Sequence, residues 1–165
     1  MYEILGVITL KGKSIFNRKD YIFVGHTSKT KNGYVATISD SELTGKGDGC
    51  VVKSIDDFME GYVVMINGKG EIIFDYEIKS IHNAIFSTEL CNHRCVMCPQ
   101  PPIVREDDKT PFNLKLISLI DKNAREIGIT GGEPTLLGDK LFALIRKIQK
   151  HQPKAAISLL SNGVM

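Results

Sequence analysis

The pattern of apolar segments changes near residue 80, and this change constrains the fold more than any other feature of the chain. Residues 1–80 contain short runs rich in Val, Ile, Tyr and Phe, separated by Gly, Asn, Asp and Lys, as is typical of strands joined by turns. From residue 83 the pattern becomes strand, helix, strand, helix, strand, which builds a parallel sheet. The sequence therefore predicts an α/β chain, with a small antiparallel β domain of unknown role at 1–80 and an α/β domain at 83–165.

Six strands are expected in the first segment: Tyr2–Leu10, Tyr21–Gly25, Tyr34–Ser39, Cys50–Ile55, Tyr62–Ile66 and Glu71–Ile78. Between the last two, Asn67–Gly70 predicts a hairpin, because Asn and Gly tolerate the positive φ angles of tight turns. Five elements are expected in the second segment: strands Ala84–Thr88, Arg125–Thr130 and Ala155–Leu160, and helices Leu114–Asn123 and Asp139–His151. Pro111 and Asn113 suit the start of the first helix, with Asn113 as its cap.

Composition narrows the class of protein. Apolar residues make up 42% of the chain and charged residues 24%, which is ordinary for a globular protein. A net charge of +2 gives no reason to expect nucleic acid or a membrane surface as partner. The N-terminus has no secretory signal, and no apolar run approaches the roughly 18 residues of a membrane span, so we expect a cytoplasmic protein. Arg105–Lys109 is expected to be a solvated loop, and Cys50 a buried structural thiol.

Three of the four cysteines are crowded into the motif C-x3-C-x2-C at residues 91–98. In a chain without a secretory signal, this spacing indicates a metal or cluster site rather than a disulfide scaffold. Thiolates are the ligands of iron–sulfur clusters, usually four per [4Fe–4S] cube, so three cysteines leave one iron open to a small molecule. Zinc is the alternative, with His93 or His82 as fourth ligand, although the chain lacks the paired knuckles typical of zinc sites.

A second motif, Gly131-Gly132-Glu133-Pro134, follows the second predicted strand of the α/β segment, just as the cysteines follow the first. Parallel α/β sheets place their chemistry in the loops beyond the carboxyl ends of the strands, so the two motifs are expected to meet. Taken alone, the glycine motif could be only a turn between a strand and a helix. The phosphate-binding patterns G-x-x-x-x-G-K-[ST] and G-x-G-x-x-G are absent, so nucleoside triphosphate hydrolysis has no support.

In this order, the two motifs resemble those of the radical S-adenosylmethionine (SAM) superfamily, and Asn92 and Arg94 match its frequent C-N-x-R-C form. The resemblance covers residues 83–165 and implies the N-terminal half of a partial (β/α)6 barrel, namely its first three β/α units. It implies an enzyme with a [4Fe–4S] cluster and SAM as cofactors, and an electron donor such as flavodoxin or ferredoxin. In that family the reduced cluster cleaves SAM to a 5′-deoxyadenosyl radical, which abstracts hydrogen from the substrate.

The resemblance also implies roles for individual residues. The cluster ligands would be Cys91, Cys95 and Cys98, with no catalytic residue beyond them. Glycine in the second motif would let backbone carbonyls approach the SAM amino group, and Glu133 would add a charge-assisted hydrogen bond to that group. Met97 stands where many members of the family place an aromatic residue near the adenine. The implied SAM contacts are Gly131, Gly132, Glu133, Pro134, Met97, Ser161 and Asn162.

A finer resemblance is to the radical SAM maturase of the His-Xaa-Ser system, a peptide-modifying branch. It rests on Ser87–Asn92, on Cys95–Pro102 and on the β-rich segment before the barrel. It implies post-translational modification of a ribosomally made peptide with His-Xaa-Ser repeats. Two alternatives stay open: a small molecule or a glycyl-radical protein as substrate, and a non-catalytic module with a structural cluster.

Fewer β/α units than the six of the full family fold are expected before Met165, since each βαβ unit takes roughly 30 residues. We therefore expect a fragment, a split-gene half or a truncated product. An open sheet edge after the third strand invites pairing, so a complementing chain for the remaining barrel is an expected partner.

Overall fold

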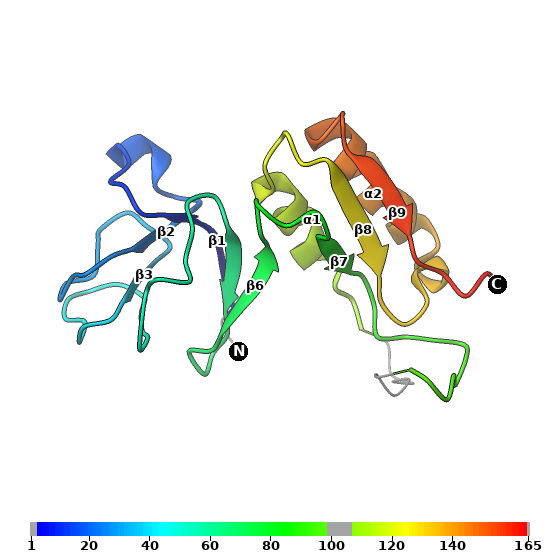
Figure 1. The fold of residues 1–165 in the computed structure, drawn as a ribbon, viewed down its shortest axis with the longest axis horizontal. Coiled ribbons are helices and arrows are strands. Elements are labelled where there is room, and N and C mark those ends of the chain that lie inside the picture. The colour runs from blue at the N-terminus through cyan, green and yellow to red at the C-terminus, as the bar shows by residue number, and fades with distance from the viewer. Residues whose placement is uncertain (1–2, 99–106, 165) are drawn as a thin grey trace. The chain divides into compact units, whose positions relative to one another are not determined.

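The structure is a computed structural model that describes residues 3–98 and 107–164 (Figure 1). It divides into two compact units, Met1–Ile78 and Lys79–Met165, close to the change in the sequence pattern. Three parts of the sequence predictions lie outside the described residues: Tyr2 of the first strand, Pro99–Pro102 of the finer resemblance, and Arg105 and Glu106 of the charged loop. In the two described stretches, no helix combines the length and the apolar character needed to cross a membrane.

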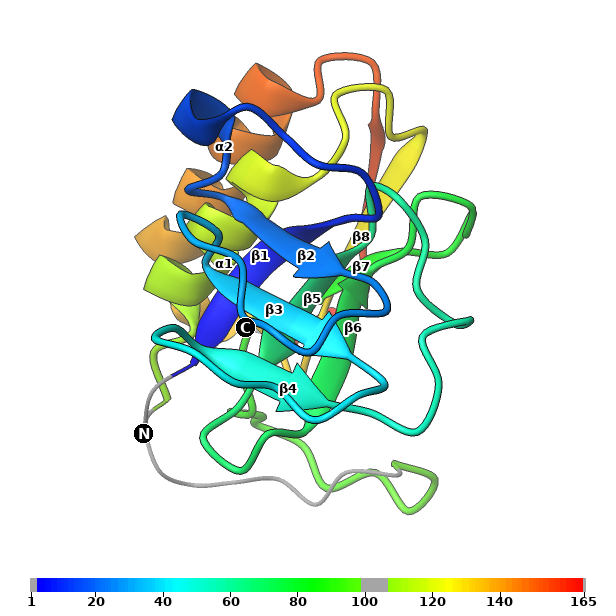
Figure 2. The same ribbon diagram turned by 90° about the vertical axis from the view of Figure 1, so that its left-hand side faces the viewer.

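Within its described residues, the first unit holds a six-stranded sheet in the order β4-β3-β2-β1-β5-β6 (Figure 2). The strands are β1 (Ile4–Thr9), β2 (Tyr21–Val24), β3 (Ala36–Ser39), β4 (Gly49–Val51), β5 (Val63–Ile66) and β6 (Ile72–Tyr76). Strands β1 to β4 pair in parallel, whereas β5 pairs antiparallel with β1 on one side and with β6 on the other. The prediction of an antiparallel domain is therefore wrong, and the sheet is mixed.

The error has a physical cause in the connections. Parallel strands are usually joined by helices, and that alternation is what makes a parallel sheet visible in a sequence. Between β1 and β4 the described connections carry only a short 3-10 helix, η1 (Ile15–Asn17). The Gly- and Asn-rich stretches here turn the chain back without a helix, and so they resemble hairpin loops.

The core of the first unit follows the register of its strands. Ile8 lies opposite Ile22, and Ile38 lies opposite Cys50, all with at most 8% of their surface exposed. The Cys50 thiol donates to the carbonyl of Gly70 at 3.1 Å, and burial raises the pKa of this thiol. The prediction of a buried thiol at Cys50 is confirmed.

The predicted hairpin joins β5 and β6. Asn67 Oδ1 accepts hydrogen bonds from the backbone N–H groups of Lys69 and Glu71, at 2.9 and 3.0 Å. Gly70 has a φ of 80°, a conformation that glycine adopts without steric cost. The turn chemistry and the antiparallel pairing agree, so this prediction is confirmed.

The second unit is built from alternating strands and helices. Its described strands, β7 (Ala84–Phe86), β8 (Glu126–Thr130) and β9 (Ala156–Leu159), form a parallel sheet in that order. Helices α1 (Thr110–Leu119) and α2 (Asp139–His151) lie on one face of this sheet (Figures 1 and 2). The parallel pairing is confirmed, and α2 has the predicted bounds. A short 3-10 helix, η2 (Pro134–Leu137), follows β8 and was not predicted.

Helix α1 begins four residues earlier than predicted, at Thr110, with Pro111 in its first turn. Asn113 is therefore not the cap. It is buried inside the helix, where its Nδ2 donates to the carbonyl of Phe86 at 3.1 Å and ties α1 to β7. At the helix start, Asp108 Oδ1 instead accepts from the Thr110 N–H at 3.1 Å.

Apolar contacts between sheet and helices make up the core of the second unit. Ile85 lies opposite Ile129 in the sheet, and both are buried. Leu144 and Ile148, fully buried on α2, carry the apolar face expected from the helical spacing. Gln152, just after α2, donates from Nε2 to two carbonyls at the end of α1, at 2.9 and 3.1 Å. These contacts hold the two helices against the sheet and against each other.

Candidate functional site

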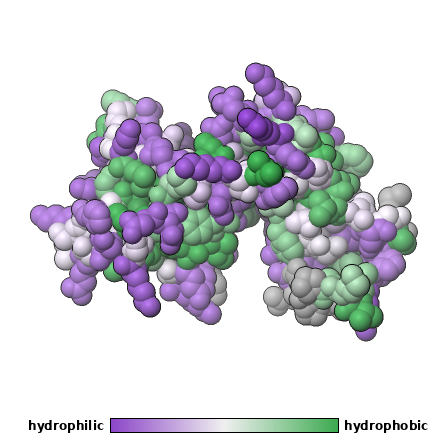
Figure 3. Space-filling model, in the orientation of Figure 1, coloured by the Kyte–Doolittle hydropathy of each residue, from purple (hydrophilic) through white to green (hydrophobic). Residues whose placement is uncertain are grey.

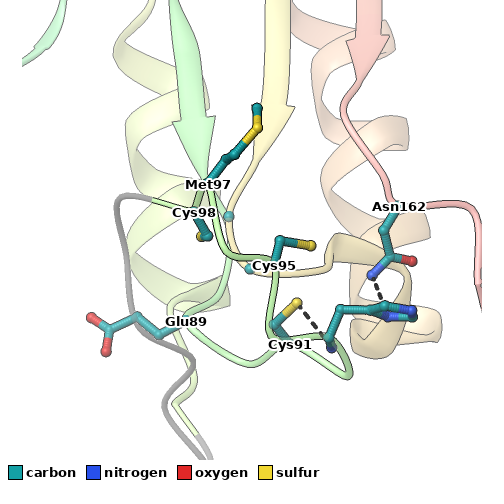
Figure 4. A pocket seen from close by; sticks show the side chains of 9 residues that line it. Glu89, Cys91, Cys95, Met97, Cys98 and Asn162 are labelled. Carbon is teal, nitrogen blue, oxygen red and sulfur yellow. Dashed lines mark hydrogen bonds between the residues drawn. The ribbon is translucent and has the colours of Figure 1, made fainter.

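A cavity of about 280 Å³ lies beyond the carboxyl ends of β7, β8 and β9 (Figure 4). Three segments contribute to it: the loop after β7, the turn after β8 and the turn after β9. The lining residues are Glu89, Cys91, His93, Cys95, Met97, Cys98, Gly131, Gly132 and Asn162. The cysteine motif and the glycine motif, about 40 residues apart in sequence, therefore share one cavity. It lies beyond the carboxyl ends of the strands, where the sequence predicted that the two motifs meet.

The three cysteine side chains come from one irregular loop. Cys91 is half-buried, whereas Cys95 and Cys98 are exposed. The backbone N–H of Cys98 donates to the carbonyl of Cys95 at 3.1 Å, which turns the chain, and the N–H of His93 lies 3.4 Å from the Cys91 sulfur. Their thiols point in different directions (Figure 4). Across residues 3–98 and 107–164, no three His, Cys, Asp or Glu side chains are arranged to hold a metal ion as they stand.

The two glycines are required by a close crossing of backbones. A Cβ on Gly131 would lie 2.4 Å from the carbonyl oxygen of Thr88, and a Cβ on Gly132 would lie 2.1 Å from that of Leu90. The N–H groups of Gly132 and Glu133 donate to these same carbonyls, at 2.8 and 2.7 Å. The turn after β8 thus packs directly on the chain that leads into the cysteine motif. Any other residue type at these positions would push the two segments apart.

The side chain of Glu133 is completely buried, and protein donors surround it. Oε1 accepts from the backbone N–H and the hydroxyl of Thr135, at 3.0 and 2.8 Å, and Oε2 accepts from the N–H of Asn162 at 2.6 Å. Burial raises the pKa of this carboxyl, but the hydrogen bonds from Thr135, Asn162 and Ser161 outweigh it and hold the pKa below its ordinary value. Glu133 does not line the cavity, so its expected contact with a SAM amino group stays a prediction.

The other expected SAM contacts lie at different distances from the cavity. Met97 lines it but is 93% exposed, and its neighbour Val96 is exposed as well. Figure 3, in the orientation of Figure 1, shows hydrophobic surface at the lower right, on the side where the loop after β7 lies. Asn162 lines the cavity. Ser161 and Pro134 do not; Ser161 Oγ accepts from the N–H of Gly163 at 3.0 Å, and Pro134 is buried at the start of η2.

A charged network secures the start of the cysteine loop, and the sequence did not reveal it. Asp107 accepts from the Thr88 hydroxyl at 2.6 Å and from the Glu89 N–H at 3.0 Å, and Lys109 lies 3.3 Å from the Glu89 carboxylate. Burial raises the pKa of Asp107, but these hydrogen bonds and Lys109 lower it further than burial raises it. The interpretation of this segment as a solvated loop is therefore wrong for Asp107. Mixed charges in a sequence do not show which of them find partners.

Comparison with known proteins agrees with this geometry. Residues 85–165 match the family model described as the radical SAM superfamily. This stretch is a radical SAM domain. A GTP 3′,8-cyclase of Sulfurovum sp. (strain NBC37-1) is 31% identical over 108 residues, which cover 62% of this chain and 31% of that protein. A GTP 3′,8-cyclase of Nautilia profundicola is 30% identical over 101 residues, covering 56% of this chain and 30% of that protein.

The chain thus spans less than a third of the length of either relative. No solved structure gave a significant match. The superfamily expected from the two motifs is confirmed at the level of the domain, whereas neither relative carries the name of the His-Xaa-Ser maturase.

A radical SAM domain implies a [4Fe–4S] cluster and SAM, and the donor set around the cavity suits them. Three thiols from one loop reach one cavity, and thiolate sulfur is the protein ligand that iron–sulfur clusters use. The loop carries Cys95 and Cys98 exposed, so their side chains have space to converge on a common centre. Cys91, Cys95 and Cys98 would hold the cluster.

The geometry of the described residues does not support the alternative of a zinc site. His93 lines the cavity, but its Nδ1 lies 3.2 Å from Asn92 Oδ1 and 3.3 Å from Asn162 Nδ2. The imidazole ring therefore contacts the side-chain amides of two asparagines. His82 is exposed before β7 and does not line the cavity. Among the described residues, neither histidine joins the cysteines in a group placed to bind a metal.

Proposed function

We propose that this chain is part of a radical SAM enzyme, which binds a [4Fe–4S] cluster through Cys91, Cys95 and Cys98 and cleaves SAM reductively. One observation carries the proposal: the three thiols and the Gly131-Gly132 turn line a single cavity in a radical SAM domain. When bound, the cluster and SAM would supply the one-electron chemistry that amino-acid side chains lack.

The residues of the chain have separate tasks in this proposal. The cysteines hold the cluster, and the glycine turn keeps the backbone of the second motif against the cysteine loop. Two further wall residues already have partners inside the protein: the Glu89 carboxylate lies 3.3 Å from Lys109, and the Asn162 amide donates to Asn92 at 2.8 Å.

For the substrate we propose a ribosomally made peptide with His-Xaa-Ser repeats. The support is the sequence around the cluster motif, Ser87–Asn92 and Cys95–Pro102, and the β-rich unit that precedes the domain. The relatives favour a second candidate, a small-molecule substrate of the nucleotide class, because both are GTP 3′,8-cyclases matched over more than half of this chain. Proposed partners are an electron donor such as flavodoxin or ferredoxin, and a complementing chain that supplies further β/α units.

Anaerobic reconstitution with iron and sulfide tests the cluster. We expect a brown protein with about four irons per chain. Cys95→Ala should lose the colour, whereas Cys50→Ala should keep it, because Cys50 is buried in the other unit. A colourless protein with stoichiometric zinc after oxygen-free preparation would refute the proposal.

Product analysis then tests the reaction. With dithionite and SAM, the reconstituted protein should release 5′-deoxyadenosine. A His-Xaa-Ser peptide and GTP, added in parallel, should differ in whether they increase this release and whether their own mass changes. A stable cluster that never releases 5′-deoxyadenosine, alone or with a complementing chain, would instead indicate a non-catalytic cluster-binding module.

A further inference from the structure

Two asparagines join the cysteine loop to the turn after β9. Asn162 Nδ2 donates to Asn92 Oδ1 at 2.8 Å, and Asn92 Nδ2 donates to the carbonyl of Val164 at 2.9 Å. The Val164 N–H donates in turn to Asn162 Oδ1 at 2.9 Å. These contacts close a ring of hydrogen bonds around two side-chain amides. Asn92 lies directly after Cys91, so the ring holds the chain at the first cysteine.

One end of this ring is fixed from inside the protein. The Asn162 N–H donates at 2.6 Å to the fully buried carboxylate of Glu133. Glu133 is itself held by its N–H on the Leu90 carbonyl at 2.7 Å, one residue before Cys91. The carboxylate therefore connects the turn after β8 with the turn after β9, and both turns contact the chain on either side of Cys91.

We propose that Glu133, Asn162 and Asn92 form a chain of positioning residues that sets the place of Cys91 before any cofactor binds. This inference rests on the proposed function, because it concerns the loop that would hold the cluster. It gives Glu133 a task different from a contact with SAM. The buried carboxylate orients Asn162, Asn162 orients Asn92, and Asn92 fixes the backbone next to the first cluster ligand.

The geometry explains why each residue type is needed. A carboxylate can accept at both oxygens, as Glu133 does from Thr135 and from Asn162, whereas a glutamine amide can accept at only one end. The side-chain amide of Asn92 uses its oxygen towards Asn162 and its nitrogen towards Val164. Alanine at that position removes both side-chain contacts and keeps the same backbone N–H and C=O groups.

The test measures alkylation of the metal-free protein by iodoacetamide, with each cysteine followed by mass spectrometry. In Asn92→Ala and in Glu133→Gln, we expect Cys91 to react about tenfold faster than in the parent chain. Asn92→Ala removes two hydrogen bonds of the ring, and Glu133→Gln weakens the carboxylate contact that holds Asn162. The buried Cys50 serves as the internal reference. Asn123→Ala is the matched control, because Asn123 is an exposed asparagine in the loop before β8, at the other end of that strand.

Non-additivity separates positioning from general loosening of the fold. Asn92→Ala and Asn162→Ala act on the same ring, so the double variant should expose Cys91 no more than the stronger single variant does. Leu144→Ala should lower the melting temperature but leave the Cys91 rate unchanged well below it. If Glu133→Gln does not fold, Asn92→Ala still decides the matter, because Asn92 is exposed.

An unchanged Cys91 rate in a folded Asn92→Ala protein would overturn the inference, as would additive effects in the double variant. The measurement needs no iron and no SAM. A failed reconstitution would therefore count against the proposed function but not against the positioning chain. An unchanged rate of Cys91 alkylation would count against the positioning chain but not against the proposed function.

Discussion

Gly132→Ala should unfold the site, because a single methyl group would stand where a backbone carbonyl already lies. The added Cβ would be 2.1 Å from the carbonyl oxygen of Leu90, more than an ångström inside ordinary contact, which begins at 3.4 Å. No rotation of a side chain relieves this clash, because both partners are backbone. The turn after β8 and the cysteine loop must separate.

The cost follows from the contacts that this separation breaks. Two backbone hydrogen bonds are lost, from Gly132 to Thr88 and from Glu133 to Leu90, at roughly 1 kcal/mol each. Forced repacking of a well-packed contact adds about 1–3 kcal/mol. The sum is about 3–5 kcal/mol, and 1 kcal/mol lowers the melting temperature of a domain this size by roughly 4–8 °C. We therefore expect the second unit to melt at least about 12 °C lower.

Thermal unfolding by circular dichroism, together with hydrogen exchange of peptides from the second unit, measures the effect. Gly138→Ala is the control, because its Cβ meets no atom within 4 Å, although Gly138 has a φ of 55°. Its ψ of −125° lies outside the left-handed helical region, and alanine in such a sparsely populated conformation costs about 1–3 kcal/mol. If Gly132→Ala melts no lower than Gly138→Ala, the close crossing of the two backbones is not what requires a glycine here.

Two further changes test the cores of the two units. Leu144→Ala on α2 should cost about 2–5 kcal/mol in chemical denaturation, because the side chain is fully buried, whereas Arg146→Ala on the exposed face should change stability by less than about 0.5 kcal/mol. In the first unit, burial and then nearby Glu3 raise the pKa of Asp75 to about 6, and its Oδ2 has no hydrogen-bond partner among the described residues. The folded chain holds this proton more tightly than the unfolded chain does, so stability should fall as the pH rises from about 4 to above 6. Asp75→Asn should flatten that dependence in urea titrations, and a slope unchanged by the substitution would show that another group causes it.

Sequence patterns predicted the second unit well because its signals are local. The helical spacing of Leu141, Leu144 and Ile148 makes α2 visible within a dozen residues, and its observed bounds are the predicted ones. The start of α1 was missed because Asn113 has the chemistry of a cap but is drawn inside by the Phe86 carbonyl. That carbonyl is 27 residues away in sequence, and no local pattern reports it.

The first unit shows the opposite case. Its strands were found, but their directions were not, since strand composition is the same in parallel and antiparallel sheets. Only the hairpin at Asn67–Gly70 carries a local signal of direction, and it was predicted. The parallel pairing of β1 to β4 depends on how helix-free connections travel in space.

The candidate site combines both situations. The positions of the two motifs in the sequence were sufficient to predict that the cysteines and the glycine motif meet. The structural roles of Gly131, Gly132 and Glu133 could not be inferred in this way. Each depends on an atom about 30 to 40 residues away: the carbonyls of Thr88 and Leu90, and the N–H of Asn162. These contacts form within the protein and need no ligand.

It follows that the glycine motif has a structural requirement that precedes any cofactor. A chain that needs two glycines and a buried carboxylate to join three loops would need them even with an empty cavity. Loss of activity on substituting Glu133 would therefore not distinguish contact with SAM from loss of the site's shape. Measurements on the metal-free protein do distinguish them, because a residue that only contacts the cofactor leaves Cys91 where it was, whereas a residue that builds the site does not.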